Sequence, residues 1–355
     1  ERTPHNCTAG WKPDPLLDVP ESGVPLVPAG VTQPLLIECC IPREADAGNY
    51  SGSFAVSAVN EAGRRVELLQ VPVKLEVWPI TIPELGAKDS FTTMFTFNGA
   101  DPPHSFGLKK WYPDSSAEEL WRQWFPFLSH YRVPGDSSYS QGRRVEELTA
   151  LASSGAKWIN LLAIGYPDPK QPGGVPVGEP DKAITDLEPI VANVSRNALL
   201  MNRSLYVYGF DEMNPSLNQS LYTIFGAVKQ RWPWLRTVAT LDWNNMPLDV
   251  PLDVWVDSYD DYGTSPSWEI PTAKEKLRQD FLAASPGREF FWYWCVGPHD
   301  PRYMNTFVEW PAIQARLLFW LSALHGITGM LYYQDDLWWE ECDTPSTPRP
   351  CTPLS

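Results

Sequence analysis

The stretch LYVYGFDEMNP, residues 205–215, joins a predicted strand to a predicted helix and decides the fold class. Residues 205–210 form a short apolar and aromatic run that is typical of a buried strand. Asn214 and Pro215 are residue types that favour the N-cap and the first position of a helix. A helix is predicted over residues 215–232. A strand that leads directly into a helix indicates one βα unit of a parallel sheet.

The same pattern recurs along most of the chain, and helix signals lie between most of the apolar runs. The eight predicted strands cover residues 91–97, 130–133, 157–163, 205–210, 237–242, 254–259, 289–296 and 328–333. Gly155 and Gly326 are expected to end two of the helices, and Pro189 is expected to interrupt a third. Eight βα units over roughly 260 residues predict an α/β fold, a TIM-like (β/α)8 barrel. The alternative is an open doubly wound sheet, which normally carries a Gly-rich phosphate turn after its first strand; residues 97–100 contain one glycine.

The last predicted helix, residues 311–325, carries an apolar stripe of the kind that faces a core. The stripe consists of Ile313, Leu317, Trp320, Leu321 and Leu324. Its most apolar part, residues 317–324, is far shorter than the ~20 residues that cross a bilayer. We therefore expect no membrane span.

The N-terminal part of the chain has a different character. Short alternating runs at residues 35–41, 53–59 and 66–77, separated by turn signals, predict an antiparallel β-sandwich. Two prolines stiffen the following segment, residues 78–83, which reads as a linker. The predicted organisation is a β-sandwich domain over residues 1–85, a catalytic barrel over 86–341 and a C-terminal tail over 342–355.

The charge balance excludes some classes of partner. The formal net charge is −15, whereas nucleic-acid and anionic-membrane binding depend on clustered Lys and Arg. The 17 tryptophans among 45 aromatic residues favour a thick core or stacking surfaces. No CxxC pair occurs and the histidines show no ligand spacing, so no metal or other cofactor is expected.

Sequons and cysteines point to a eukaryotic secretory or secreted protein. Asn-X-Ser/Thr sequons occur at Asn6, Asn49, Asn193, Asn202 and Asn218. Chance would give about one or two, so we expect surface glycans. Six cysteines, an even number, fit an oxidising compartment.

The spacing of the cysteines limits their pairing. Cys342 and Cys351 bracket a Pro/Thr-rich loop and are expected to form a disulfide. Cys7 is expected to pair with Cys39 or Cys40, and Cys295 is left free or buried.

Polar and aromatic residues gather at the C-terminal ends of the predicted strands, where barrel enzymes carry their active sites. Aromatic rings stack on the apolar faces of a sugar, while Asp and Asn bond to its hydroxyl groups. This pattern predicts a carbohydrate substrate. The candidate substrate-binding residues, chosen from strand-end position alone, are Asn98, Tyr208, Trp243, Tyr259, Trp294 and Tyr332.

The adjacent acids Asp211 and Glu212 directly follow the strand at residues 205–210. An Asp-Glu dipeptide is usually a solvated turn, or charges the first turn of a helix. Glycoside hydrolysis normally uses two acids, but neighbours in sequence flank a glycosidic bond poorly. Adjacency makes sense if a 2-acetamido group of the substrate attacks the anomeric carbon. One acid then orients that amide, and its neighbour protonates the leaving oxygen.

The chain resembles glycoside hydrolase family 123, the β-N-acetylgalactosaminidases, in several stretches that include this acidic pair. The matching stretches are GNYSGSFAVSA, VPVKLEVWPITIP, LYVYGFDEMNP, LDVWVDSY, FFWYWCVGP and WPAIQARLLFWLSALHGITGMLYYQ. The resemblance implies that Asp211 orients the amide and that Glu212 is the acid/base. It also implies retention of configuration through an oxazoline. Met213 stands where proline commonly follows the pair, and the family's additional β-domains are not evident.

Three alternatives remain open at this point. A family 20-like β-N-acetylhexosaminidase also uses an Asp-Glu pair on a barrel strand. An ordinary retaining glycosidase would need no acetamide on its substrate. A catalytically silent lectin would also present aromatic residues at strand ends.

Overall fold

A computed structural model describes most of the chain, in two compact units. The described residues are 30–32, 34–60, 62–87, 90–96, 114–136, 138–139, 143–164, 180–212, 218–241, 248–258, 272–295, 297–298, 303–306 and 310–333. The units are Glu1–Pro83 and Glu84–Ser355. The domain boundaries predicted at residues 85 and 341 stay predictions, and the tail over 342–355 lies outside the described residues.

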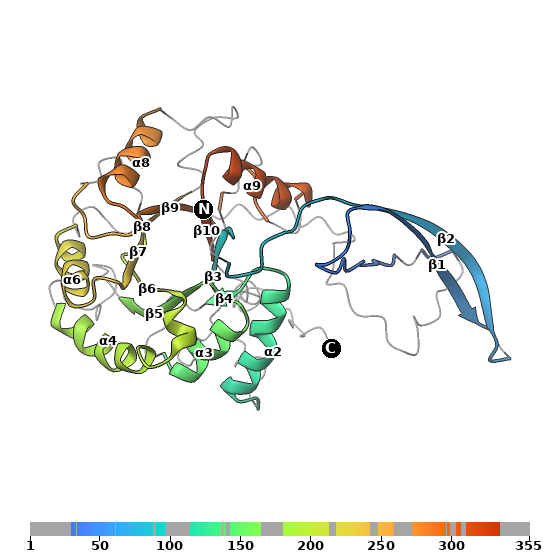
Figure 1. Ribbon diagram of the computed structural model, residues 1–355, viewed down its shortest axis with the longest axis horizontal. Helices are drawn as coiled ribbons and strands as arrows, with labels where there is room; N and C mark the ends of the chain where they lie inside the picture. The colour runs from blue at the N-terminus through green and yellow to red at the C-terminus, as the bar shows by residue number, and fades with distance from the viewer. Residues whose placement is uncertain are drawn as a thin grey trace, which may run out of the picture. The chain divides into compact units, whose positions relative to one another are not determined.

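The N-terminal unit contains a long antiparallel ribbon of β1 (Gly48–Val59) and β2 (Arg65–Val77) (Figure 1). Its turn is held by Asn60, whose Oδ1 accepts from two backbone N–H groups at 3.0 Å. The register puts apolar residues on one face, where Tyr50 lies opposite Leu75 and Phe54 opposite Val71. Polar pairs such as Ser51 opposite Lys74 alternate with them. The ribbon is therefore amphipathic across its two faces.

The β-sandwich predicted for this unit is not observed. Among its described residues β1 and β2 form one sheet, and residues 35–41 are not a strand. Leu35, Leu36 and Ile37 are exposed instead. Alternation and turn residues identify strands that pair locally, but they carry no information on how many sheets stack.

The second unit is a mixed α/β fold built on an eight-stranded sheet in which every pairing is parallel. Its strands are β3 (Thr92–Thr96), β4 (Gly135–Asp136), β5 (Trp158–Ile164), β6 (Ser204–Gly209), β7 (Arg236–Thr240), β8 (Val254–Ser258), β9 (Glu289–Trp294) and β10 (Gly329–Tyr332). The order is β4-β3-β10-β9-β8-β7-β6-β5, so the first strand of the sheet in sequence, β3, pairs with the last, β10. This pairing curls the sheet around an interior.

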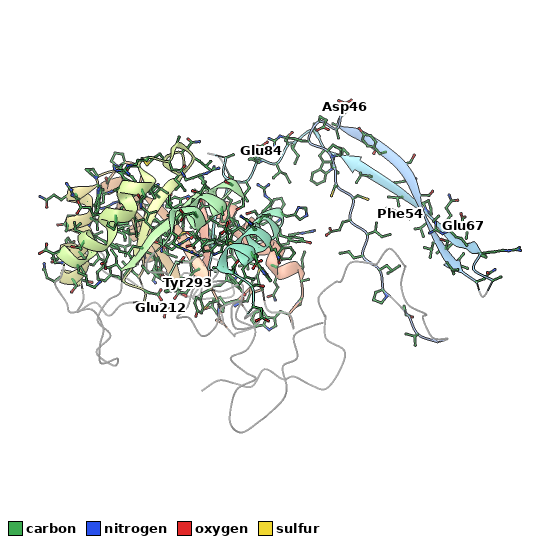
Figure 2. The ribbon with its side chains drawn as sticks, turned by 90° about the horizontal axis from the view of Figure 1, so that it is seen from below. Asp46, Phe54, Glu67, Glu84, Glu212 and Tyr293 are labelled. Atoms are coloured by element: carbon green, nitrogen blue, oxygen red, sulfur yellow. The ribbon has the colours of Figure 1, made fainter. Side chains whose placement is uncertain are left out.

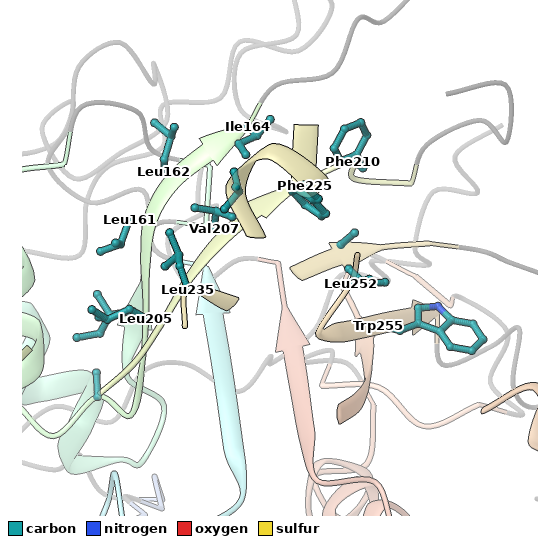
Figure 3. Close-up of a cluster of buried hydrophobic side chains, with 14 of the residues drawn as sticks. Leu161, Leu162, Ile164, Leu205, Val207, Phe210, Phe225, Leu235, Leu252 and Trp255 are labelled. Atoms are coloured by element: carbon teal, nitrogen blue, oxygen red, sulfur yellow. The ribbon is translucent and has the colours of Figure 1, made fainter. Parts of the chain in front are cut away.

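The helices lie outside the curled sheet (Figure 1). They are α2 (Ala117–His130), α3 (Val145–Ser153), α4 (Pro180–Val194), α5 (Ala198–Met201), α6 (Asn218–Arg231), α8 (Thr272–Ala284) and α9 (Ile313–Leu324). One buried cluster joins these helices to outward strand side chains such as Leu205, Val207 and Trp255 (Figure 3). A second cluster, with Tyr206, Tyr208 and no helical residue, fills the interior. Side chains alternate between the two clusters along strands such as β6, β8 and β9.

The ladder is not closed into a full ring over the described residues. No strand pairing joins β4 to β5, and β4 has two residues. Side chains span the gap: Asp136 Oδ2 accepts from the backbone N–H of Asn160 at 2.6 Å. Arg143 donates to Asp136 Oδ1 at 2.9 Å and to the carbonyl of Asn160 at 3.1 Å. The closed TIM-like barrel predicted from the sequence is thus observed as a curled parallel sheet with its outer helices.

The strand predicted over residues 130–133 is wrong, because α2 extends to His130. A capping box at Ser116 starts this helix. At its other end, Arg132 adopts a left-handed φ of 63°. The N–H groups of Arg132 and Val133 then bond to the carbonyls of Ser129 and Leu128. This Schellman motif ends the helix without glycine, and β4 follows it.

Pro189 does not interrupt a helix, contrary to the prediction. It lies inside α4, between the buried residues Leu187 and Val191. Burial of this apolar face holds the helix together despite the missing N–H of the proline. Gly155 and Gly326 end α3 and α9 with left-handed φ values of 104° and 64°, as predicted.

The apolar stripe predicted for α9 is mostly on the outside. Trp320 and Leu324 are 70% and 74% exposed, and Ile313 and Leu317 are also exposed. Leu321, from the stripe, and Leu318, outside it, are buried. The helix is apolar nearly all round, so periodicity could not choose a face. Within the described residues, no helix combines the length and apolarity that a membrane crossing requires.

A pair of matched substitutions in α9 tests this orientation. Leu318→Ala should lower the free energy of unfolding by about 2–5 kcal/mol because it leaves a cavity in the core. Leu324→Ala should change it by less than about 0.5 kcal/mol because that side chain is exposed. Urea denaturation of both variants measures the difference. An equal loss for Leu324→Ala would mean that the outer face of α9 is covered.

Candidate active site

The site begins at the C-terminal end of β6. Tyr206 and Tyr208 point into the interior of the sheet, and Gly209 follows them. A Cβ at Gly209 would lie 2.8 Å from the carbonyl oxygen of Ile164 on β5. Only glycine lets the two strands approach so closely at this level. The close approach fixes where the chain leaves the sheet and enters the acidic pair.

The backbone on both sides of Asp211 is left-handed, an unusual conformation for residues with side chains. Phe210 has a φ of 57° and Glu212 a φ of 45°. Each such residue costs about 1–3 kcal/mol and persists only where its surroundings enforce it. Phe210 is fully buried, with its ring centroid 5.1 Å from that of Phe225. The N–H of Glu212 donates to the carbonyl of Thr240 at 2.8 Å. The packing of Phe210 and the hydrogen bond from Glu212 stabilise the turn in this conformation.

Tyrosine hydroxyl groups enclose the carboxylate of Asp211. Tyr208 donates to Oδ1 at 2.5 Å, and Tyr139 donates to Oδ2 at 3.0 Å. The Oγ1 of Thr240, on β7, lies 2.6 Å from the Tyr208 hydroxyl. Because the single proton of Tyr208 is directed to Asp211, Thr240 acts as the donor in that pair. Asp211 therefore accepts one hydrogen bond from the segment that follows β4 and one from β6.

Burial and charge set the proton affinity of this group. Burial raises the pKa of Asp211 above its ordinary value, and the charge of Glu212 raises it further. The bond from Tyr208 acts in the opposite direction and is the second largest influence. The pKa values of Tyr139 and Tyr208 are raised well above the ordinary value, mainly by burial. Both hydroxyls thus remain donors toward Asp211.

Glu212 lies in a different environment, although it is the next residue. Its side chain is exposed, and its Oε1 accepts a hydrogen bond from the hydroxyl of Tyr293 on β9. Figure 2 shows Glu212 and Tyr293 together at one edge of the unit. Burial and the bond to Glu212 raise the pKa of Tyr293, so this hydroxyl also keeps its proton. The two carboxyl groups are therefore held by different strands: Asp211 from within and Glu212 at the open edge.

Aromatic rings surround Asp211 as well. The ring of Tyr139 packs edge-on against Tyr208 at 5.4 Å and against Tyr333 at 5.5 Å between centroids. Tyr333 directly follows β10, while Tyr139 follows β4. A carboxylate pair beside tyrosine rings at the ends of parallel strands is suited to binding a sugar.

The structure brings some of the predicted site residues together and separates others. Asp211, Glu212 and Tyr208 lie together. Trp294 and Tyr332 pack in the outer cluster with the helices, on the opposite face of the sheet from Tyr293 and Tyr208. Asn98, Trp243 and Tyr259 lie outside the described residues.

Tyr139, Thr240, Tyr293 and Tyr333 were not among the residues predicted from the sequence. Tyr293 and Tyr333 each lie one position away from a predicted residue. Adjacent residues of a strand face opposite sides, so an error of one position selects the wrong face. Strand β9 reads EFFWYW, in which aromatic residues occupy both faces. The inward orientation of Tyr208 on β6 does not determine which residues of β9 face inward. Tyr139 follows β4, a strand of two residues, whereas the predicted strand covered residues 130–133.

Among the described residues, no group of three or more His, Cys, Asp or Glu side chains is arranged to hold a metal ion. A cavity of about 520 Å³ lies elsewhere, lined by residues of α3, α4 and β5 such as Leu148, Leu162 and Ile190. It includes neither Asp211 nor Glu212, so hydrogen-bond geometry rather than cavity size identifies the site.

The predicted modification sites are distributed over both units. Asn49, Asn193 and Asn202 are exposed, and Asn218 is half-buried at the start of α6. Asn6 lies outside the described residues. So do Cys7, Cys342 and Cys351, which leaves the pairing of Cys342 with Cys351 a prediction. Cys39 and Cys40 are exposed and form no disulfide in the structure.

Comparisons with known proteins agree with the sequence resemblance. Residues 258–351 match the family model described as glycoside hydrolase 123, catalytic domain. This segment does not include the acidic pair. The chain also resembles a family 123 glycoside hydrolase from Clostridium perfringens, whose structure was described in work on glycolipid glycan hydrolysis. The TM-score is 0.54 at 13% identity, covering 84% of this chain and 60% of that one.

Other similar structures are more distant. They include a family 5 glycoside hydrolase from Bacteroides vulgatus (TM-score 0.39, 13% identity, 79% of this chain and 62% of that one) and a glucosidase from Croceicoccus marinus (TM-score 0.37, 16% identity, 53% and 44%). None of the curated proteins compared with the chain matches it. The resemblance of the chain to family 123 is confirmed.

The raised pKa of Asp211 predicts a specific dependence of stability on pH. A protonated Asp211 stabilises the folded state below the pKa of the unfolded chain, about 3.9. That contribution is lost as the pH rises through the higher folded pKa. The free energy of unfolding of the wild type, relative to Asp211→Asn, should therefore fall as the pH rises from about 4 to 7. Thermal denaturation of both proteins across this range measures it. A difference that grows with pH would contradict the assignment.

Proposed function

Because the chain resembles family 123 both in a catalytic-domain segment and in its fold, we propose that it is a retaining exo-β-N-acetylgalactosaminidase. It hydrolyses terminal β-linked GalNAc, and the substrate's own 2-acetamido group attacks the anomeric carbon. The observation that carries the proposal is the contrast between two neighbouring acids. Asp211 is half-buried and its carboxylate accepts from two tyrosine hydroxyls, whereas Glu212 is exposed.

Asp211 orients the acetamide. Its carboxylate accepts the amide N–H, which turns the carbonyl oxygen toward the anomeric carbon. As that oxygen forms its bond, positive charge develops on the ring of the oxazoline, and the ionised carboxylate stabilises it. The hydroxyls of Tyr139 and Tyr208 hold Asp211 in place and favour its ionised form. An acid fixed in this way needs no reorganisation during the reaction.

Glu212 is the acid/base. It donates its proton to the leaving oxygen as the glycosidic bond breaks, so no free alkoxide forms. It then takes a proton from the water that opens the oxazoline, and the configuration at the anomeric carbon is retained. An exposed position at the edge of the sheet suits this role, because the aglycone leaves there and water enters. Tyr293 holds the carboxyl group of Glu212 toward the site.

We also propose the finer architecture behind this site. The pairing of β3 with β10 and the side-chain bridge from Asp136 to Asn160 support a (β/α)8 barrel whose seam lies between β4 and β5. The one-sided apolar face of the β1–β2 ribbon supports a second layer packed against it, as in a sandwich.

Substitution of the two acids tests the catalytic roles. Asp211→Asn and Glu212→Gln should each lower kcat on an aryl β-GalNAc by about 10²–10⁴-fold with the fold unchanged. Glu188→Gln, which alters an exposed acid of α4 paired with Arg231, is the matched control and should retain full activity. Kinetics and circular dichroism measure both effects. Turnover close to the wild type in either site variant would end the assignment.

Three assays separate this proposal from its alternatives. A family 20-like β-N-acetylhexosaminidase would cleave aryl β-GlcNAc comparably, since the two sugars differ at the C4 hydroxyl. An ordinary retaining glycosidase would not bind a GalNAc-thiazoline tightly, because that inhibitor mimics the cyclised intermediate. A lectin would show saturable binding without turnover. NMR of the first anomer released distinguishes retention from inversion.

We propose further that the protein passes through a eukaryotic secretory pathway and carries N-glycans. Asn49, Asn193 and Asn202 are exposed sequon residues that a glycosyltransferase can reach. Expression in secretory cells should give a protein whose mass falls on treatment with an N-glycosidase. Asn→Gln variants at these three positions should each remove about one glycan. An unchanged mass would contradict the proposal.

A further inference from the structure

Asn160 is a fully buried polar residue in the interior of the sheet, away from the acidic pair in sequence. It lies on β5 at an irregularity of the β5–β6 pairing, between Asn160 and Leu162. An amide in such a place needs partners for both its donor and its acceptor, because a buried polar group without a hydrogen bond destabilises the folded state. The identity of those partners connects Asn160 to the site.

The amide side chain joins two segments of backbone. Its Oδ1 accepts from the N–H of Tyr208 at 3.1 Å, and its Nδ2 donates to the carbonyl of Ser138 at 3.1 Å. At the irregularity, the side chain thus supplies an acceptor for β6 where the regular ladder is interrupted. Leucine has a similar volume and could make neither bond. Aspartate could keep the first but not the second.

Both segments carry a tyrosine that bonds to Asp211. Tyr208 donates to Oδ1, and Tyr139, which follows Ser138 directly, donates to Oδ2. One amide therefore fixes the backbone beneath both hydroxyls. The backbone of Asn160 is itself held by Asp136 and Arg143 across the seam between β4 and β5.

We propose that Asn160 is a positioning residue of the catalytic site, which sets the spacing of the Tyr139 and Tyr208 hydroxyls around the carboxylate of Asp211. It contacts no substrate. This inference rests on the proposed function for its kinetic consequences, although its structural basis stands without it. Loss of the amide moves the two hydroxyls and leaves Asp211 with fewer donors when the oxazolinium charge develops.

The expected effect is on turnover rather than on substrate affinity. Asn160→Leu should lower kcat on an aryl β-GalNAc by about 10–100-fold, because displacements of about 1 Å have effects of this size. KM should change by less than about threefold. The matched control is Thr237→Val, which removes a buried hydroxyl of β7 that bonds to Pro251 and Asp253. This variant should be less stable than the wild type but equal to it in kcat.

The pH profile gives a readout that a purely structural role would not move. The groups that face Asp211 among the described residues are Tyr139, Tyr208, Thr240 and Glu212. Bonds from the hydroxyls favour the carboxylate, so weakening them raises the pKa of Asp211 further. The acid limb of kcat/KM should shift to higher pH in Asn160→Leu and stay in place in Thr237→Val. An unmoved limb together with unchanged kcat would overturn the proposal.

A double-substitution cycle covers the case in which Asn160→Leu fails to fold. Asn160→Asp retains an acceptor for Tyr208 and loses the donor to Ser138. Its effect on kcat should therefore be strong alone and small in a Tyr139→Phe background. Equal effects in both backgrounds would show that Asn160 does not act through Tyr139.

A measurement that needs no substrate separates this inference from the proposed function. Carbon NMR of the carboxyl groups, with Asp211→Asn used for assignment, follows the titration of Asp211 directly. The pKa of Asp211 should be higher in Asn160→Leu, which adds no charge of its own, than in the wild type. If the wild type fails to cleave β-GalNAc, the proposed function fails, and this titration still decides the role of Asn160. An unchanged pKa overturns it.

Discussion

The arrangement of the site depends on holding one carboxylate, that of Asp211, among tyrosine side chains at the inner face of the curled sheet. Burial makes the charge of Asp211 costly, and the neighbouring charge of Glu212 adds to the cost. The hydroxyls of Tyr139 and Tyr208 offset it by donating from two sides, with Thr240 behind Tyr208. Because these groups come from separate βα units, the acid is ordered only when the curled sheet is assembled. The geometry of the proposed site therefore depends on the folded sheet.

Neighbouring acids acquire separate roles through the backbone that carries them. Left-handed conformations at Phe210 and Glu212 direct successive side chains to opposite surroundings, one enclosed and one exposed. The close packing of Gly209 on β5 and the bond from Glu212 N–H to Thr240 prevent the turn from relaxing. Two carboxyl groups that are adjacent in sequence therefore lie in different surroundings at the same end of the sheet.

Sequence patterns predicted the parallel βα units because each strand and helix carries its own local signal. Strands β3, β5, β6, β7, β8, β9 and β10 lie within or overlap the predicted runs. The patterns failed where information is not local. In β9 and α9 nearly every position is apolar, so neither the inner face of the strand nor the buried side of the helix could be chosen. The acidic pair was found because it follows a strand directly. Its tyrosine partners at 139 and 293 come from distant segments and depend on strand phase.

The left-handed turn also has an evolutionary consequence. Asn and Gly adopt such backbone angles more readily than Phe or Glu, so either residue at position 212 would relieve local strain while removing the proposed acid/base. Selection for thermal robustness alone would drive this position away from its present identity. Under the proposed function, a strained backbone at a catalytic residue is an instance of the trade-off between stability and activity.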